Sequence, residues 1–163
     1  MTLGILALDL SRSTGWALRR RDGTVASGVE SFHQDEHEHP AQVLQRFSGW
    51  VRALLPAADY VTWERVVGGS AGMSARSFLF VLESQVMLAA YDLNVQTKTV
   101  FPSSLKKHAT GDGRSKKPAM RAAALRRWPN AVWEDTLTGD DEADALCVLA
   151  WAIDELDPKE APT

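Results

Sequence analysis

Residues 3–10, with the sequence LGILALDL, form a short and continuous apolar run that contains a single carboxylate, Asp9. A run of this length and composition predicts a buried β-strand. Residues 14–20 and 24–31 follow on either side of Arg21-Asp22-Gly23, and an Asp-Gly turn between two such segments indicates a β-hairpin. The three segments together predict an antiparallel meander at the start of the chain.

Helical spacing of apolar residues predicts helices in the remainder of the chain, and short apolar runs predict strands. The helices are expected at residues 41–55, 74–92, 103–108, 116–128 and 140–156, and the strands at residues 59–66 and 94–101. Each of these two strands is reached through a helix, so both should join the sheet in parallel. We therefore predict an α/β fold with a mixed five-stranded sheet, antiparallel in its first three strands and flanked by helices.

The composition is that of an intracellular globular protein. The chain has 163 residues, of which 45% are hydrophobic, so we expect one domain at residues 1–156 and a frayed tail at residues 157–163. The one cysteine, Cys147, excludes a disulfide framework and favours a reducing, cytoplasmic location. No segment approaches the length of a membrane span, so no membrane contact is expected.

Positive charge is concentrated in one part of the sequence. Residues 98–127, called the basic stripe below, contain nine basic residues and one acid, hence a net charge of +8, although the whole chain has a net charge of −3. Such a stripe is typical of proteins that bind a phosphate backbone. A solvated helix face is the alternative, but stabilising helix faces usually interleave acids with bases. The stripe therefore favours nucleic-acid binding.

Carboxylates occur at three separated places where folding alone does not require them. Asp9 and Glu64 end apolar strands, and Asp141 and Asp144 lie about one turn apart at the acidic start of the last helix. Taken singly, Asp9 could cap the turn that follows it, and Asp141 could complement the helix dipole. Taken together, the four supply oxygen ligands of the kind that Mg²⁺ prefers. This set indicates phosphodiester chemistry.

Four motifs in this order resemble RuvC-type Holliday-junction resolvases of the ribonuclease H-like superfamily. They are Leu8-Asp9-Leu10-Ser11 followed by Thr14-Gly15-Trp16, the strand-end Glu64, the lysine- and glycine-containing stretch at residues 102–117, and Asp141-Glu142-Ala143-Asp144. The resemblance extends over residues 3–153. It implies a ribonuclease H-like fold and a homodimeric endodeoxyribonuclease that nicks opposing strands of a four-way DNA junction and leaves 5′-phosphates.

The resemblance also assigns roles to residues. It implies that Asp9, Glu64, Asp141 and Asp144 are catalytic and hold two Mg²⁺ ions, for which Mn²⁺ can substitute, and no nucleotide cofactor is expected. Lys106 and Lys117 match the basic positions of the family best. The residues to which we assign DNA binding are Lys106, Lys107, Arg114, Lys116, Lys117 and Arg121, with His108 as a supporting residue. The helix at residues 74–92 would form the dimer interface, although a fully buried helix has the same apolar pattern.

Some assignments stay open at this point. Asp140 and Glu142 enrich the acidic cluster, so the spacing alone does not fix which two of its carboxylates bind metal, or whether Asp141 or Asp140 and Glu142 share in it. The loop at residues 33–39 contains three histidines and three acids, and we interpret it as an exposed acidic loop and not as a metal site. The acidic total and the glycine-rich segment 68–72 favour a divergent, phage-type member of the family.

Three other functions fit parts of the sequence. Residues 9–15 resemble the phosphate loop of actin-like ATPases, but those proteins need a second lobe that 163 residues cannot supply. A non-catalytic junction-binding protein would not need four acids in this order. A less selective nuclease for flaps and branched DNA has the same sequence features as a strict junction resolvase.

Overall fold

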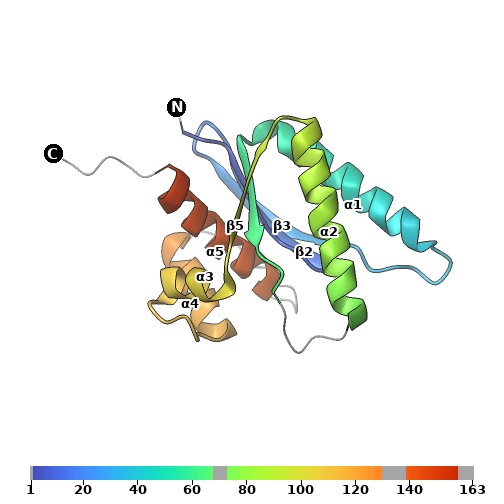
Figure 1. The fold of residues 1–163 in the computed structure, drawn as a ribbon. Helices are drawn as coiled ribbons and strands as arrows, with labels where there is room; N and C mark the ends of the chain where they lie inside the picture. Colours follow the sequence, from blue (N-terminus) through green and yellow to red (C-terminus); the bar gives the residue numbers. More distant parts are fainter. Residues whose placement is uncertain (1, 68–72, 130–138, 158–163) are drawn as a thin grey trace.

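The computed structural model has a strand or helix at each predicted position (Figure 1). It describes residues 2–67, 73–129 and 139–157, and the glycine-rich segment 68–72 lies outside these ranges. The strands are β1 (Ile5–Asp9), β2 (Ser13–Arg19), β3 (Val25–Ser31), β4 (Tyr60–Glu64) and β5 (Gln96–Val100). The helices are α1 (Pro40–Leu54), the 3₁₀ turn η1 (Leu55–Ala57), α2 (Met73–Asp92), α3 (Pro102–Thr110), α4 (Lys117–Arg127) and α5 (Gly139–Leu156).

The five strands form one mixed sheet with the order β3-β2-β1-β4-β5. Strands β1, β2 and β3 pair antiparallel, whereas β4 pairs in parallel with both β1 and β5, so the predicted topology is confirmed. Leu8 of β1 is paired with Trp63 of β4. Asp9 is the residue after Leu8, and Glu64 is the residue after Trp63. Because the two strands are parallel, these acids lie side by side at the same edge of the sheet.

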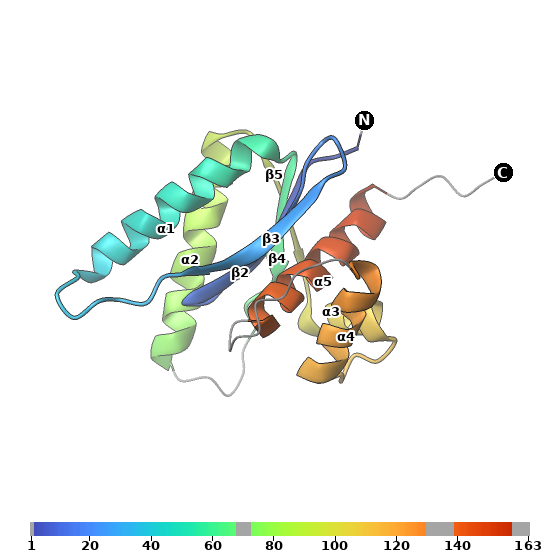
Figure 2. The same cartoon turned by 180° about the vertical axis from the view of Figure 1, so that it is seen from behind.

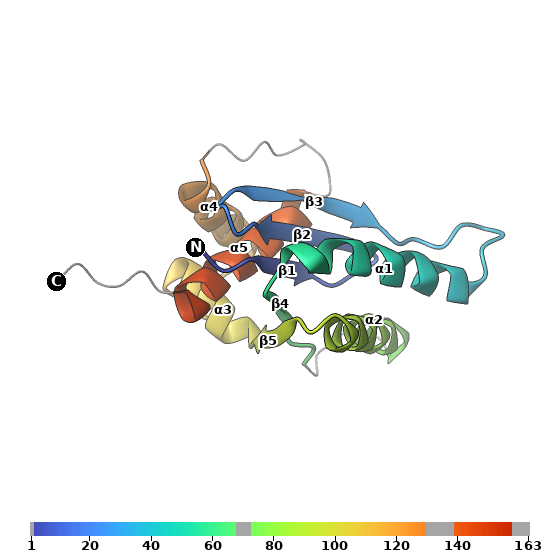
Figure 3. The ribbon, with the colours of Figure 1, turned by 90° about the horizontal axis from the view of Figure 1, so that it is seen from above.

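Helices cover both faces of the sheet, and each face has its own core (Figures 2 and 3). Helices α1 and α2 pack on one face, where Leu6, Leu8 and Trp63 are buried. Helices α3, α4 and α5 cover the opposite face, where Ile5 and Ala7 are buried. Because side chains alternate between the two faces of a strand, the continuous apolar run of β1 contributes to both cores.

Helix α5 lies directly on strands β1 and β2. Its buried face carries small side chains, including Ala143 and Ala145, which allow close packing on the sheet. At its first turn, a Cβ atom on Gly15 of β2 would lie 1.9 Å from the backbone oxygen of Asp141, so only glycine permits this approach. The start of α5 is also held by Glu142, whose carboxylate accepts a 2.6 Å hydrogen bond from the Ser27 hydroxyl of β3.

The two ends of the described chain are joined by a buried cation. The Arg19 side chain donates a 2.5 Å hydrogen bond to the Asp157 carboxylate and a 3.1 Å hydrogen bond to the carbonyl of Leu3. Asp157 is the first residue of the predicted frayed tail, and the rest of that tail, residues 158–163, lies outside the described residues. Among the described helices, none is both long enough and apolar enough to cross a bilayer.

Replacing Gly15 by Ala should displace the start of α5, because the added methyl group would overlap the Asp141 carbonyl. We expect the free energy of unfolding to fall by about 1–3 kcal/mol, the usual cost of overpacking, as measured by urea or thermal denaturation. The matched control is Gly49→Ala in α1, where an added Cβ meets no atom within 4 Å. That change should raise stability by about 0.5–1 kcal/mol. Equal stability of the two variants would contradict the close approach of α5.

Candidate active site

A cavity of about 670 Å³ opens where the parallel strands end. Three carboxylates line it: Asp9 at the end of β1, Glu64 at the end of β4, and Asp144 on the second turn of α5. Helices α3 and α4 and the turn between them also line the cavity, and they contribute Lys106, Arg114, Ser115, Lys116 and Lys117. Segments that are far apart in the sequence thus bring acids and bases together around one cavity.

The carboxylates are close enough to disfavour one another's charged forms. Burial, followed by the charges of Asp144, Asp141 and Glu64, raises the pKa of Asp9 well above its ordinary value, although Lys117 opposes the shift. Burial is also the main reason why the pKa of Glu64 is raised, and the charge of Asp144 adds to it. The protein therefore holds these groups in a place where their ionisation is unfavourable unless positive charge is present.

The pKa values of Asp141 and Asp144 are raised by the same cause, burial. Burial raises the pKa of Asp141, and the charges of Asp144 and Asp140 add to the shift while Lys117 opposes it. Burial raises the pKa of Asp144 as well, even though Lys117 donates a hydrogen bond to its carboxylate. Asp141 does not line the cavity, but its carboxylate belongs to the same electrostatic cluster as Asp9 and Asp144.

The donor chemistry of this cluster fits a divalent cation. Its ligands are carboxylate oxygens, which Mg²⁺ and Mn²⁺ accept, and their mutual repulsion would be relieved by a doubly charged ion. In the part of the chain that the structure describes, no three His, Cys, Asp or Glu side chains are placed to hold one ion. Mg²⁺ commonly uses only one or two carboxylates and completes its shell with waters and substrate phosphates.

The structure separates the neighbouring acids that spacing alone leaves equivalent. Glu142 points to β3, where its carboxylate accepts a hydrogen bond from Ser27, and only 9% of the residue is exposed. It is therefore engaged in holding α5 on the sheet. Asp140 does not line the cavity, and its charge acts on Asp141 and Asp144.

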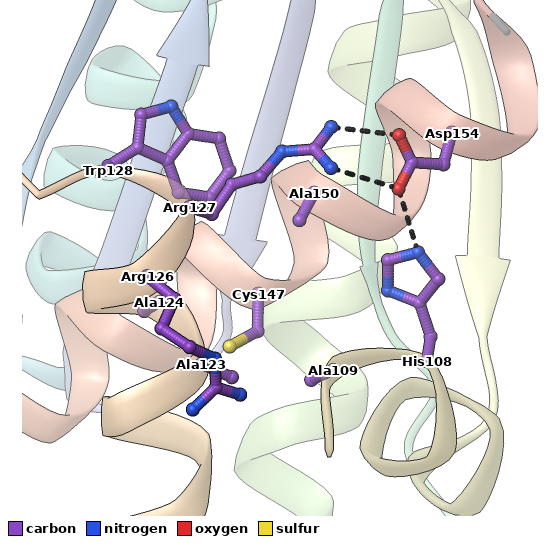
Figure 4. A pocket seen from close by; sticks show the side chains of 10 residues that line it. All are labelled: His108, Ala109, Ala123, Ala124, Arg126, Arg127, Trp128, Cys147, Ala150 and Asp154. Carbon is purple, nitrogen blue, oxygen red and sulfur yellow. Dashed lines mark hydrogen bonds and ion pairs between the residues drawn. The ribbon is translucent and has the colours of Figure 1, made fainter. Parts of the chain in front are cut away.

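Two of the predicted DNA-binding residues and the predicted supporting residue, His108, lie outside the cavity. Lys107 and Arg121 belong to the basic stripe but do not line the cavity. The ring of His108 is 3.0 Å from the Asp154 carboxylate, which also accepts two hydrogen bonds, of 2.8 and 3.2 Å, from Arg127 (Figure 4). Asp154 follows Asp144 by ten residues, or about 15 Å along α5. His108 is thus part of an ion-pair cluster away from the carboxylates.

This ion-pair cluster borders a second cavity of about 290 Å³ between α3, α4 and α5. Figure 4 shows Trp128 and Arg127 on one side, His108 on the other, and Cys147 in between. Burial raises the pKa of the Cys147 thiol to about 12. The thiol is therefore protonated at neutral pH and has the character of a core side chain.

The loop at residues 33–39 is held by structural contacts. Nδ1 of His39 accepts a hydrogen bond from the backbone N–H of Ala41 and caps α1. Glu38 is paired with Arg46 at 2.8 Å, and His33 lies 3.2 Å from the Ser13 hydroxyl. These contacts support the interpretation of the segment as an exposed acidic loop.

Two contributors to the site were not identified from the sequence. Gly15 lies opposite Asp9 in the β1–β2 ladder, and its missing side chain admits the start of α5. Its place in the Thr14-Gly15-Trp16 motif was visible, but the partner that needs the space was not. Ser115, in the turn between α3 and α4, lines the cavity and is 2.5 Å from the Thr110 hydroxyl. No local pattern marks it.

Solved structures with this fold include two of RuvC. Thermus thermophilus RuvC matches with a TM-score of 0.71 and 15% sequence identity, over 92% of this chain and 95% of that chain. T. thermophilus RuvC in complex with a Holliday junction substrate matches with a TM-score of 0.73 and 14% identity, over 90% of each chain. The chain therefore has the ribonuclease H-like fold of RuvC. The sequence matches no protein-family model and no curated protein.

Neutralising Asp9 should stabilise the metal-free protein. The folded-state pKa of Asp9 is raised, so between the unfolded-state pKa and that value the folded state binds more protons, and stability falls as the pH rises. In EDTA, Asp9→Asn should therefore raise Tm at pH 7.5, by about 2–4 °C for each kilocalorie per mole regained, and should have little effect near pH 4.

The control for this measurement is Asp22→Asn, because its shift has the opposite sign. A hydrogen bond from the Thr24 hydroxyl, with another from the Thr24 backbone, lowers the pKa of Asp22. Its contribution to stability is present above the unfolded-state pKa and is lost as the pH falls, so the variant should not gain stability at pH 7.5. A lower Tm of the Asp9 variant at pH 7.5 would show that the carboxylate is not destabilising.

Proposed function

We propose that this chain is a Mg²⁺-dependent endodeoxyribonuclease that nicks four-way DNA junctions symmetrically and leaves 5′-phosphates, with residues 1–156 acting as one nuclease domain. The observation that carries this proposal is the convergence of Asp9, Glu64 and Asp144 with lysines around one cavity. A binding protein has no need for buried acids beside a phosphate-binding surface, because they would repel DNA. A metal-dependent nuclease needs both.

The carboxylates would hold the metal. The charges of Asp144, Asp141 and Glu64 all act on Asp9, so we assign Asp9, Glu64 and Asp144 as the residues that would hold the metal, with Asp141 in support. Two bound Mg²⁺ ions would supply an activated water and stabilise the leaving 3′-oxygen. The chain itself would orient the scissile phosphate through the bases that line the same cavity as the acids.

The bases facing the acids would bind the DNA backbone. Lys106, Arg114, Lys116 and Lys117 line the cavity and would contact phosphates next to the cleaved bond. We assign Lys107 and Arg121, on α3 and α4 outside the cavity, to phosphates further along the strand. The strong net charge of the stripe would then account for affinity, whereas the cavity would account for cleavage.

A homodimer would place two such cavities on one junction. Helix α2 buries only one of its faces, on which Leu82 and Val86 are fully covered. Its other face exposes large apolar side chains, among them Phe80 (49%), Met87 (53%), Leu88 (56%) and Tyr91 (83%). Exposed apolar patches of this kind mark interfaces. A two-fold axis beside α2 would relate the cavities as two symmetric cuts require.

The carboxylates should be needed for cleavage and dispensable for binding. Asp9→Asn, Glu64→Gln and Asp144→Asn should each abolish nicking of a labelled four-way junction in Mg²⁺, and Asp141→Asn should impair it severely, while all four still shift the junction in a gel. The matched control is Glu155→Gln on the same helix, whose carboxylate lies outside the cavity and 3.9 Å from Lys98. That variant should cut like the wild type.

Duplex and flap substrates in the same assay separate the alternatives. Preference for the four-way junction supports a resolvase, and equal cutting of flaps indicates a less selective branched-DNA nuclease. Junction binding without cleavage in Mg²⁺ or Mn²⁺ would refute the nuclease and leave a junction-binding protein. Near wild-type cleavage by the Asp9 variant would refute the assignment of the metal site.

Light scattering at micromolar concentration should report twice the chain mass of 17.9 kDa. Leu88→Glu should shift the protein to monomer, because it places two like charges in the apolar interface. Gln45→Glu, on the exposed surface of α1, adds the same charge elsewhere and should leave the dimer intact. A wild type that remains monomeric yet cuts both strands would refute this interface.

A further inference from the structure

Lys117 directs its ammonium group at the carboxylates. Its Nζ donates a hydrogen bond to Oδ2 of Asp144 on α5, and both residues line the cavity. Partial burial disfavours the charged form of Lys117, but this hydrogen bond and the charges of Asp144, Asp9 and Asp141 together raise its pKa. Within the described residues, the ammonium group thus serves as a counter-ion for the cluster.

The position of Lys117 in its own helix is unfavourable for a cation. It is the first residue of α4, and the first turn of that helix contains no acidic residue. The N-terminal end of a helix carries partial positive charge and repels a cation by roughly 0.3–1 kcal/mol. The stability of α4 therefore gives no reason for a lysine here, and the contact with Asp144 does.

We propose that Lys117 is the internal counter-ion of the carboxylates in the metal-free protein, and that a divalent cation displaces it and frees its ammonium group for a DNA phosphate. The inference rests on the proposed function, because it takes the carboxylates as the metal site. The exposed fraction of the side chain is 57% for Lys117 and 19% for Asp144. The lysine is thus the partner that is free to move, and the carboxylate stays in place.

This exchange would couple metal binding to DNA binding. Without metal, the carboxylates and the DNA compete for one ammonium group. With metal, the carboxylates no longer need it, so its full charge is available to the phosphate. Each ligand should then raise the affinity for the other by the same factor, as linkage requires.

The first test measures metal binding without DNA. Mn²⁺ is titrated calorimetrically into the wild type, Lys117→Met and Lys98→Met. Lys98 is on β5 and lies 3.9 Å from Glu155, so its replacement makes the same chemical change away from the cavity. We expect the Kd for Mn²⁺ to fall at least about tenfold in Lys117→Met, because a competing positive charge is removed. Lys98→Met should bind Mn²⁺ with the same affinity as the wild type.

The second test measures the coupling. The affinity for a four-way junction is compared in Ca²⁺ and in EDTA, with the DNA verified as intact on a denaturing gel. The ratio of the two affinities should be larger in the wild type than in Lys117→Met by at least about fivefold, the lower end of ordinary coupling between sites. Lys98 belongs to the basic stripe but lies outside the cavity, so Lys98→Met should weaken junction binding equally in Ca²⁺ and in EDTA and keep the wild-type ratio.

The outcomes separate this inference from the proposed function. Mn²⁺ affinity of Lys117→Met equal to or weaker than that of the wild type overturns the counter-ion role, while the metal site itself stands. Tighter Mn²⁺ binding with an unchanged coupling ratio overturns the transfer to DNA. If none of the three proteins binds Mn²⁺, the proposed metal-dependent function fails together with the inference.

Discussion

The close approach of α5 to strands β1 and β2 is the constraint on which the carboxylate cluster depends. Asp9 belongs to β1 and Asp144 to α5, and they meet only because Gly15 leaves room for the Asp141 carbonyl. The hydrogen bond from Ser27 to Glu142 fixes the same turn from the other side. Small side chains on α5 allow the helix to lie close to the sheet along its length. A steric fit within the core thus determines the electrostatics at its edge.

That electrostatic arrangement works against folding. Burial raises the pKa of Asp9, Glu64 and Asp144, so the charged form of each carboxylate is disfavoured at its position in the fold. The burial of apolar side chains in the two cores, one on each face of the sheet, offsets this cost. The arrangement is expected where a protein binds cations. The negative charges that repel one another in the empty site also attract a cation into it.

Sequence reasoning was most reliable where local physics decides the outcome. Apolar runs, the Asp-Gly turn and helical periods predicted the five strands and five α-helices of the described residues, although not the 3₁₀ turn η1. The two strand-end acids were identified from the apolar runs that they end. It could not place groups whose partners are distant in the chain. Glu142 bonds to Ser27 and His108 pairs with Asp154, contacts that span 115 and 46 residues. Nor could it show that α2 is covered on one face and open on the other, since both faces are apolar.

The two helical layers also divide the molecule by evolutionary freedom. No described residue of α1 or α2 lines the carboxylate cavity, which is built from strand ends, from α3, α4 and α5, and from the turn between α3 and α4. Substitutions in the α1–α2 layer need only preserve its apolar core and the exposed apolar face of α2 through which we propose that the dimer forms. Substitutions in the opposite layer must keep acids and bases in register. Such a chain can drift far in sequence on one side of its sheet while its chemistry stays fixed on the other.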